Sequence, residues 1–148
     1  MFKFGYKGAG TLIYYIKSKT EVKVLLGRRL NNPDKGLWSI PGGGWEHRDG
    51  DLAETARREM WEETGFNLPK KNKNFLKRIW SFDIIAFKFE VFALRMKKPL
   101  LPKRAYEFSY VKWFDINKLP DVHKCNRFLY EEVDQLKKFL QNKGLCVV

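Results

Sequence analysis

Apolar residues in the first third of the chain follow patterns typical of β-strands. Residues 11–16 are aliphatic, aromatic or β-branched, which predicts a buried strand. Residues 21–26 begin by alternating charged residues with valine, which predicts the partner strand of a hairpin. Residues 31–36, Asn-Asn-Pro-Asp-Lys-Gly, are rich in turn-forming residues. The pattern therefore predicts a β-hairpin followed by a loop.

The spacing of apolar residues becomes helical after residue 51. Leu52, Ala56 and Met60 recur every four residues and would form one apolar stripe. Asp51 is a suitable N-cap, and Gly65 suits the position just after the last helical residue. We therefore predict a helix over residues 52–64.

Strand-like patterns return beyond this helix. Residues 75–96 contain no glycine or proline and alternate apolar with polar residues, which predicts two antiparallel strands joined around residues 81–83. Residues 108–114 predict a further strand, and helical spacing over residues 126–140 predicts a closing amphipathic helix. This order of elements predicts an α/β fold in which a mixed sheet lies between helices, an α/β/α sandwich.

Composition limits the class of protein. A chain of 148 residues with 44% hydrophobic residues can bury a sizeable core, so we expect a single domain over residues 1–148. No apolar run is long enough to span a bilayer and no signal-peptide pattern follows Met1, so we expect no membrane partner and a cytoplasmic location. Two cysteines and two histidines are too few to suggest a disulfide framework or a structural zinc site.

The formal net charge of +12 is unusual for a chain of this size. A positive surface raises the local concentration of polyanions, and it would give RNA binding that weakens steeply with salt. A lysine-rich surface of solvated side chains explains the same excess of charge. Nucleic-acid binding therefore stays open as a partner class.

Three carboxylates on the predicted helix are the main candidates for chemistry. Glu59, Glu62 and Glu63 stand at i, i+3 and i+4, so they share one helical face. Like charges at this spacing repel one another and destabilise a bare helix. A divalent cation reverses that effect, and Mg²⁺ prefers carboxylate oxygens together with substrate phosphates. The cluster predicts a magnesium site for a phosphorylated ligand.

A run of glycines, residues 42–44, lies upstream of the carboxylates. It follows Pro41 and the apolar residues 37–40, which predict a short strand with Trp38 packed in the core. Glycines let a ligand approach the main chain closely, so we expect a glycine loop that brings backbone carbonyls to the carboxylates. The alternative, a Pro-Gly turn before an acidic surface helix, accounts less well for both features together.

At these residues the sequence resembles the Nudix hydrolase family and, within it, MutT-like nucleotide pyrophosphohydrolases. The second half of the family signature is Arg-Glu, an apolar residue, any residue, Glu-Glu, any residue, Gly and an apolar residue; residues 58–66 match it throughout. Residues 25–29, 35–43 and 113–120 are also similar to family members. The resemblance covers residues 8–140 and implies the same α/β/α sandwich.

The first half of the signature departs from the family pattern. That half is Gly, any five residues, Glu and any seven residues before the Arg-Glu pair. Counting back from Arg58, the place of the expected glutamate holds Gly50; counting forward from Gly43, it holds Asp49. The loop is therefore one residue longer than in the family pattern. Either Asp49 or Asp51 stands in for the glutamate.

The resemblance implies hydrolysis of a phosphoanhydride bond in a nucleoside diphosphate linked to another moiety. The substrate would be a nucleoside triphosphate, oxidised ones included, or a nucleotide conjugate, and the cofactor Mg²⁺ or Mn²⁺. The enzymatic alternatives are removal of pyrophosphate from RNA 5′ ends and cleavage of dinucleoside polyphosphates. A non-catalytic nucleotide- or RNA-binding module is the remaining alternative. Relatives often dimerise, so a homodimer stays open.

The resemblance also assigns roles to residues of the signature. A backbone carbonyl of the glycine run, Gly43 in particular, would join Glu59, Glu62 and Glu63 as a metal ligand. Arg58 would orient Glu59 by a charge-assisted contact. We expect the glutamates to be essential for catalysis.

Candidates outside the signature are less specific. Glu107 stands where many relatives place an acidic residue near the metal, so it is a candidate general base or an ordinary loop glutamate. Arg28, Arg29 and Lys35 are candidates for contacting phosphate or are solvated loop charges. Trp38 and Trp45 are both candidates for stacking a base; the apolar run around Trp38 favours core packing for it, whereas Trp45 lies between glycine and glutamate.

Overall fold

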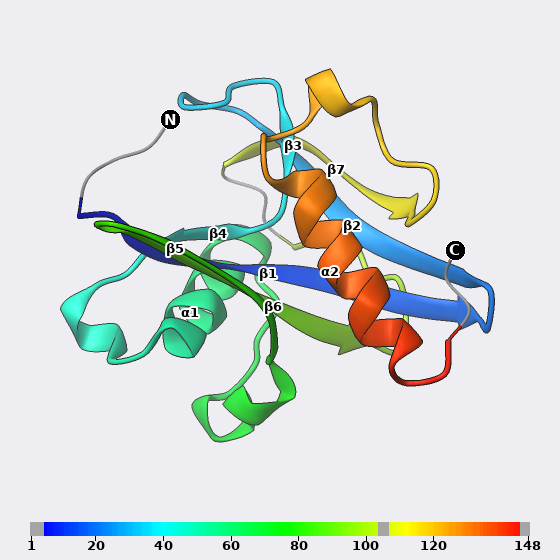
Figure 1. Ribbon diagram of the computed structural model, residues 1–148, viewed down its shortest axis with the longest axis horizontal. Coiled ribbons are helices and arrows are strands. Elements are labelled where there is room, and N and C mark those ends of the chain that lie inside the picture. The colour runs from blue at the N-terminus through cyan, green and yellow to red at the C-terminus, as the bar shows by residue number, and fades with distance from the viewer. Residues whose placement is uncertain (1–4, 104–106, 146–148) are drawn as a thin grey trace.

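The computed structural model describes residues 5–103 and 107–145 of the chain. Its strands are β1 (Lys7–Ser18), β2 (Glu21–Arg29), β3 (Trp38–Ser39), β4 (Gly42–Gly44), β5 (Lys77–Ile84), β6 (Phe87–Met96) and β7 (Phe108–Asp115). The α-helices are α1 (Leu52–Thr64) and α2 (Leu129–Gln141), and short 3₁₀ helices are η1 (His47–Asp49), η2 (Lys70–Phe75) and η3 (Val122–Lys124). The predicted α/β/α architecture is confirmed, with α1 and α2 on opposite sides of a mixed sheet (Figure 1).

Strand β1 is the centre of the sheet. Within the described residues the strands form one seven-stranded sheet of order β3-β2-β1-β6-β5, with β4 paired to β1 and β7 paired to β2. β1 runs parallel to β6 on one side. On its other side it pairs antiparallel with β2 near its C-terminal end and with β4 near its N-terminal end. β2 thus leaves β1 part-way along, and β4 takes its place.

Alternate residues of β1 face different helices. Leu12 belongs to an apolar cluster that includes Leu129 of α2. Ile13 belongs to a second cluster, with Ala56 and Met60 of α1. This two-residue alternation explains why the sheet is covered on both faces and why β1 is buried over most of its length.

Helix α1 spans the predicted residues. Asp51 accepts a hydrogen bond from the backbone N–H of Glu54 at 2.9 Å, and Gly65 adopts the left-handed conformation with φ 74°. Both ends of the helix therefore carry the predicted caps. None of the helices in the described part of the chain is long and apolar enough to cross a membrane.

The structure corrects three predicted boundaries. The glycine run forms strand β4 instead of a loop, because its residues pair with 8–10 of β1 and a Cβ on Gly42 would lie 2.6 Å from the carbonyl oxygen of Ala9. The β5–β6 turn lies beyond Ile84 instead of at 81–83, since the ladder continues through 81–84. Helix α2 begins at Leu129, after a turn closed by Asn126, whose Oδ1 accepts the N–H of residue 128.

Candidate active site

The glycine strand lies against the acidic face of α1. A Cβ placed on Gly43 would lie 2.5 Å from the carboxyl carbon of Glu59, so any side chain at this position would displace the carboxylate. Glu63, one turn further along α1 and 3% exposed, accepts a hydrogen bond from the N–H of Gly42 at 2.9 Å. Two of the three predicted metal ligands are therefore held directly against the backbone of β4.

Arg58 connects the loop, the glycine strand and the glutamates. Its Nη1 donates to Glu59 at 3.0 Å and to Glu62 at 3.2 Å. Its Nη2 donates to the carbonyl oxygen of Gly44 at 2.9 Å. Because the guanidinium is buried and planar, these contacts hold Glu59 in one position.

Of the two aspartates in the longer loop, Asp49 and Asp51, it is Asp49 that pairs with Arg58. Asp49, which is buried, accepts from Arg58 through both carboxylate oxygens, at 2.8 and 3.0 Å, and from the hydroxyl of Thr55 at 2.8 Å. These hydrogen bonds, the one from Arg58 above all, hold the pKa of Asp49 well below its usual range. Asp51 instead caps α1 and pairs with Lys73 at 3.0 Å. The longer loop contains η1 and ends at Gly50, whose φ is 74°.

Burial leaves the two inner carboxylates in an unfavourable electrostatic environment. Burial raises the pKa of Glu59, and it raises the pKa of Glu63 to about 9, helped by the nearby charge of Glu59. The hydrogen bond from Gly42 and the charge of Arg29 oppose this effect at Glu63 only in part. A divalent cation would relieve the repulsion, and the oxygen donors suit a hard cation.

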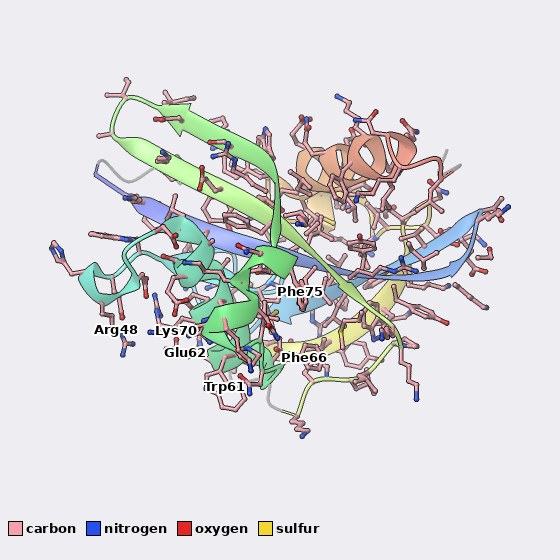
Figure 2. The ribbon with its side chains drawn as sticks, turned by 90° about the horizontal axis from the view of Figure 1, so that it is seen from below. Arg48, Trp61, Glu62, Phe66, Lys70 and Phe75 are labelled. Atoms are coloured by element: carbon pink, nitrogen blue, oxygen red, sulfur yellow. The ribbon has the colours of Figure 1, made fainter. Side chains whose placement is uncertain are left out.

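These residues do not yet form a closed ligand cage. In the described ranges, no three His, Cys, Asp or Glu side chains are grouped closely enough to hold a metal ion. Glu62 points outward from α1, where it pairs with Arg58 and lies 3.8 Å from Arg48 (Figure 2). A bound cation would therefore complete its shell with Glu62 drawn inward, backbone carbonyls such as that of Gly43, or substrate oxygens.

A cavity of about 670 Å³ opens beside the glutamates. It extends from α1 and β4 to the beginning of α2. Its lining includes Tyr6, Arg29, Ser39, Gly42, Gly43, Gly44, Glu59, Phe87, Phe89, Glu107, Asn126, Arg127, Phe128 and Glu132. Glu107 lines the same cavity as Glu59, and its charge contributes to the raised pKa of both Glu59 and Glu63.

The structure separates the remaining predicted site residues. Arg29 lines the cavity, and its Nε donates to the carbonyl oxygen of Pro33 at 2.8 Å. Arg28 is exposed and instead donates to the Ser109 hydroxyl at 3.2 Å. Like Arg28, Lys35 is exposed and outside the cavity lining.

Trp38 and Trp45 both pack against other residues of the protein. Trp38 packs edge-on against Phe114, with ring centroids 4.9 Å apart, in the predicted core position. The Trp45 indole donates to the carbonyl oxygen of Gly50 at 3.1 Å, and the Nζ of Lys7 lies 4.5 Å from its ring centroid. Trp45 thus lies outside the cavity lining, against the cluster beneath α1.

Sequence reasoning missed the contribution of α2 to the cavity. Glu132 lies on the apolar side of α2, near Leu129, Val133 and Leu136, and is 4% exposed. A charged residue inside an apolar helical stripe was the available signal. Its importance depends on the cavity, which the local pattern does not reveal.

Comparison with known proteins identifies the family. The family model for the NUDIX domain matches residues 7–136. No curated protein matches the sequence significantly.

Solved structures show the same fold at low sequence identity. The NUDIX domain of Shewanella oneidensis NrtR complexed with ADP ribose has a TM-score of 0.72 and 22% identity, covering 94% of this chain and 90% of that one. A C. elegans Ap4A hydrolase has a TM-score of 0.68 and 17% identity, covering 93% and 98%. A MutT/nudix family protein from Enterococcus faecalis has a TM-score of 0.62 and 20% identity; the match covers 78% of this chain but spans only 45% of that protein. The chain belongs to the Nudix hydrolase family, because the family model matches residues 7–136 and the glutamate helix α1 packs on the glycine strand β4.

Proposed function

We propose that this Nudix hydrolase cleaves a phosphoanhydride bond in a nucleoside diphosphate linked to another moiety, with Mg²⁺, or Mn²⁺ in its place, as cofactor. The observation that carries the proposal is the contact of Glu59 with Gly43 and of Glu63 with Gly42 at the wall of one cavity. That cavity, about 670 Å³, has the size of sites that enclose small ligands. The structure bound to ADP ribose and the Ap4A hydrolase support a nucleotide ligand.

Four oxygen donors would hold the cofactor in this proposal: the carboxylates of Glu59, Glu62 and Glu63 and the carbonyl of Gly43. When bound, a divalent cation neutralises phosphate charge and makes water a better nucleophile at neutral pH. The chain supplies the positions of these donors. Arg58 holds Glu59, and the N–H of Gly42 holds Glu63.

Two further residues of the cavity wall would act on the substrate. Arg29, whose guanidinium is anchored on Pro33, would pair with a phosphate oxygen as the substrate enters. Glu107, on the same cavity wall as Glu59, would accept the proton of the attacking water. Its backbone is positioned by the Leu30 N–H, which donates to the carbonyl of Glu107 at 2.9 Å.

Mutation of single glutamates tests the assignment. Hydrolysis with Mg²⁺ is measured by chromatography and mass spectrometry of the products on a panel of nucleoside triphosphates, ADP-ribose, diadenosine tetraphosphate and 5′-triphosphorylated RNA. These methods detect every product, including the nucleotides and ribose 5-phosphate that form without release of inorganic phosphate or pyrophosphate. We expect Glu59→Gln and Glu63→Gln to lose about 100-fold or more of the turnover, and Glu107→Gln about 10-fold. Glu131→Gln, an exposed α2 residue outside the cavity lining, is the matched control and should keep wild-type turnover. Unchanged turnover in Glu63→Gln would end the metal assignment.

The panel also decides between substrate classes. The net charge of +12 is compatible with a polyanionic substrate such as RNA. If the enzyme cleaves the RNA or diadenosine tetraphosphate faster than the other compounds, that class replaces small nucleotides as the proposed substrate. Binding of a nucleotide without any product would instead identify a non-catalytic module.

A further inference from the structure

Helix α2 directs a buried acidic residue at the cavity. Glu132 is 4% exposed and lines the cavity at the end remote from α1. Its carboxyl group makes no hydrogen bond or ion pair with any residue of the described ranges. Ser39, which is also buried on the cavity wall, has a hydroxyl oxygen without a hydrogen-bond partner among those residues. Two buried polar side chains thus face one cavity unpaired.

An unpaired carboxyl group is costly at such a position. Burial of an ionised carboxylate without a partner costs several kcal/mol, so the group takes up a proton or waits for a partner. Burial alone raises the pKa of Glu132 to about 8, and no neighbouring charge contributes. The charged groups on the cavity wall are Arg29, Asp34, Glu59, Glu107 and Arg127. At neutral pH the side chain is therefore a carboxylic acid with one O–H donor and one carbonyl acceptor.

A row of aromatic rings runs along the cavity from Phe128, beside Glu132, to Tyr6, beside the glycine strand. Phe128 precedes α2 and packs against Phe82, with ring centroids 5.2 Å apart. Phe82 in turn packs edge-on against Phe87, which stacks on Tyr6 at 5.3 Å. Phe128, Phe87 and Tyr6 all line the cavity. Such walls suit a flat heterocycle, because aromatic faces stack on planar rings.

The cavity therefore has two chemically different ends. One end carries Glu59, Gly43 and Arg29, which suit phosphate and its counter-ion. The end formed by α2 carries the Phe128 ring, Arg127 and the neutral acid of Glu132. This division matches a molecule that is anionic at one end and heteroaromatic at the other.

We propose that Glu132 hydrogen-bonds the nucleobase of the substrate in the aromatic part of this cavity. Each standard base presents a donor beside an acceptor on one edge: N–H beside C=O in 6-oxopurines and uracil, and an amino group beside a ring nitrogen in adenine and cytosine. A carboxylic acid matches such an edge with two hydrogen bonds. The assignment rests on the proposed function and adds the residue that recognises the base.

Binding measurements separate base recognition from phosphate binding. The ligands are AMP, GMP, UMP and ribose 5-phosphate, which shares the phosphate and lacks a base, titrated calorimetrically into the full chain. Glu132→Met removes both hydrogen bonds and keeps an apolar side chain of similar length. We expect this substitution to lower the affinity for at least one of the three nucleotides by about 10-fold or more. The affinity for ribose 5-phosphate should change by no more than about twofold. Glu132→Gln, which keeps a donor beside an acceptor, should retain most of the affinity.

Kinetics give a second, independent readout. For a hydrolysed nucleotide, Glu132→Met should raise KM with kcat little changed, since the base lies away from the reacting phosphate. Equal affinities of wild type and Glu132→Met for all three nucleotides would overturn the inference. So would equal losses for the nucleotides and ribose 5-phosphate, or a wild type that binds nucleotides no better than ribose 5-phosphate. Absence of turnover in the wild type contradicts the proposed hydrolysis instead, while the binding comparison still tests Glu132.

Discussion

Arg58 and Asp49 form a buried ion pair in which both carboxylate oxygens accept from the guanidinium, at 2.8 and 3.0 Å. The pair ties the loop after β4 to the middle of α1. The same guanidinium holds Glu59, so the ion pair links loop structure to the site.

Asp49→Ala should destabilise the protein strongly, because it leaves the Arg58 charge buried without its main partner. We expect a loss of about 3 to 5 kcal/mol in the free energy of unfolding, measured by urea denaturation. Asp51→Ala is the matched control: it removes a helix cap and an exposed ion pair with Lys73, and should cost about 1 to 2 kcal/mol. Equal losses in the two variants would contradict the distinction between these aspartates.

Gly43→Ala should inactivate the enzyme with limited loss of stability. The new Cβ would lie 2.5 Å from the carboxyl carbon of Glu59 and displace that side chain. We expect overpacking to cost about 1 to 3 kcal/mol and turnover to fall about 100-fold. At Gly44 the nearest atom to a new Cβ is Cε2 of Tyr6 at 3.8 Å, so Gly44→Ala serves as the control and should keep most of the turnover. A similar fall in both variants would mean that the Glu59 contact is not the cause.

Mg²⁺ should raise the thermal stability of the wild type, and chelation with EDTA should abolish both this effect and turnover. The physical reason is that a cation bound to the folded state offsets the repulsion between Glu59 and Glu63. The midpoint of thermal unfolding is recorded with and without Mg²⁺ for the wild type, Glu59→Gln and the control Glu131→Gln. We expect the shift to persist in Glu131→Gln and to vanish in Glu59→Gln; a full shift in Glu59→Gln would exclude that residue as a ligand.

Glu132 should make the folded state less stable as pH rises through neutrality. Burial raises its pKa from 4.5 to about 8 in the folded state. Below pH 4.5 the Glu132 carboxyl carries its proton in both the folded and the unfolded protein. Between pH 4.5 and about 8 it loses the proton only in the unfolded protein, so the free energy of unfolding falls. The decrease approaches about 5 kcal/mol, at about 1.4 kcal/mol for each pKa unit between 4.5 and about 8, and then levels off.

Urea denaturation between pH 5 and 8.5 measures this effect. Glu132→Gln does not titrate, so its stability should fall less over the same range. Glu63, whose pKa is also raised, remains in both proteins, and the difference between the two curves therefore reports Glu132 alone. Parallel curves would show that Glu132 is already ionised in the folded protein.

Features that depend on neighbours in the chain could be predicted from the sequence. The bounds of α1, its Asp51 cap and the shared face of Glu59, Glu62 and Glu63 follow from helical periodicity and from capping over three or four residues. The strand patterns of β1 and β2 follow from β-branched and alternating residues in the same way.

The tertiary structure alone decided which distant groups meet. Asp49 and Asp51 are equal candidates along the chain, yet only Asp49 faces Arg58, because the η1 turn directs it inward. The glycine run became a strand because β2 leaves β1 and exposes its N-terminal edge. Glu132 acquires a cavity only when α2 packs across the sheet from α1. The composition of the chain and its local spacing determined the chemical groups available; contacts between segments far apart in sequence, whose energies no local pattern contains, determined where those groups act.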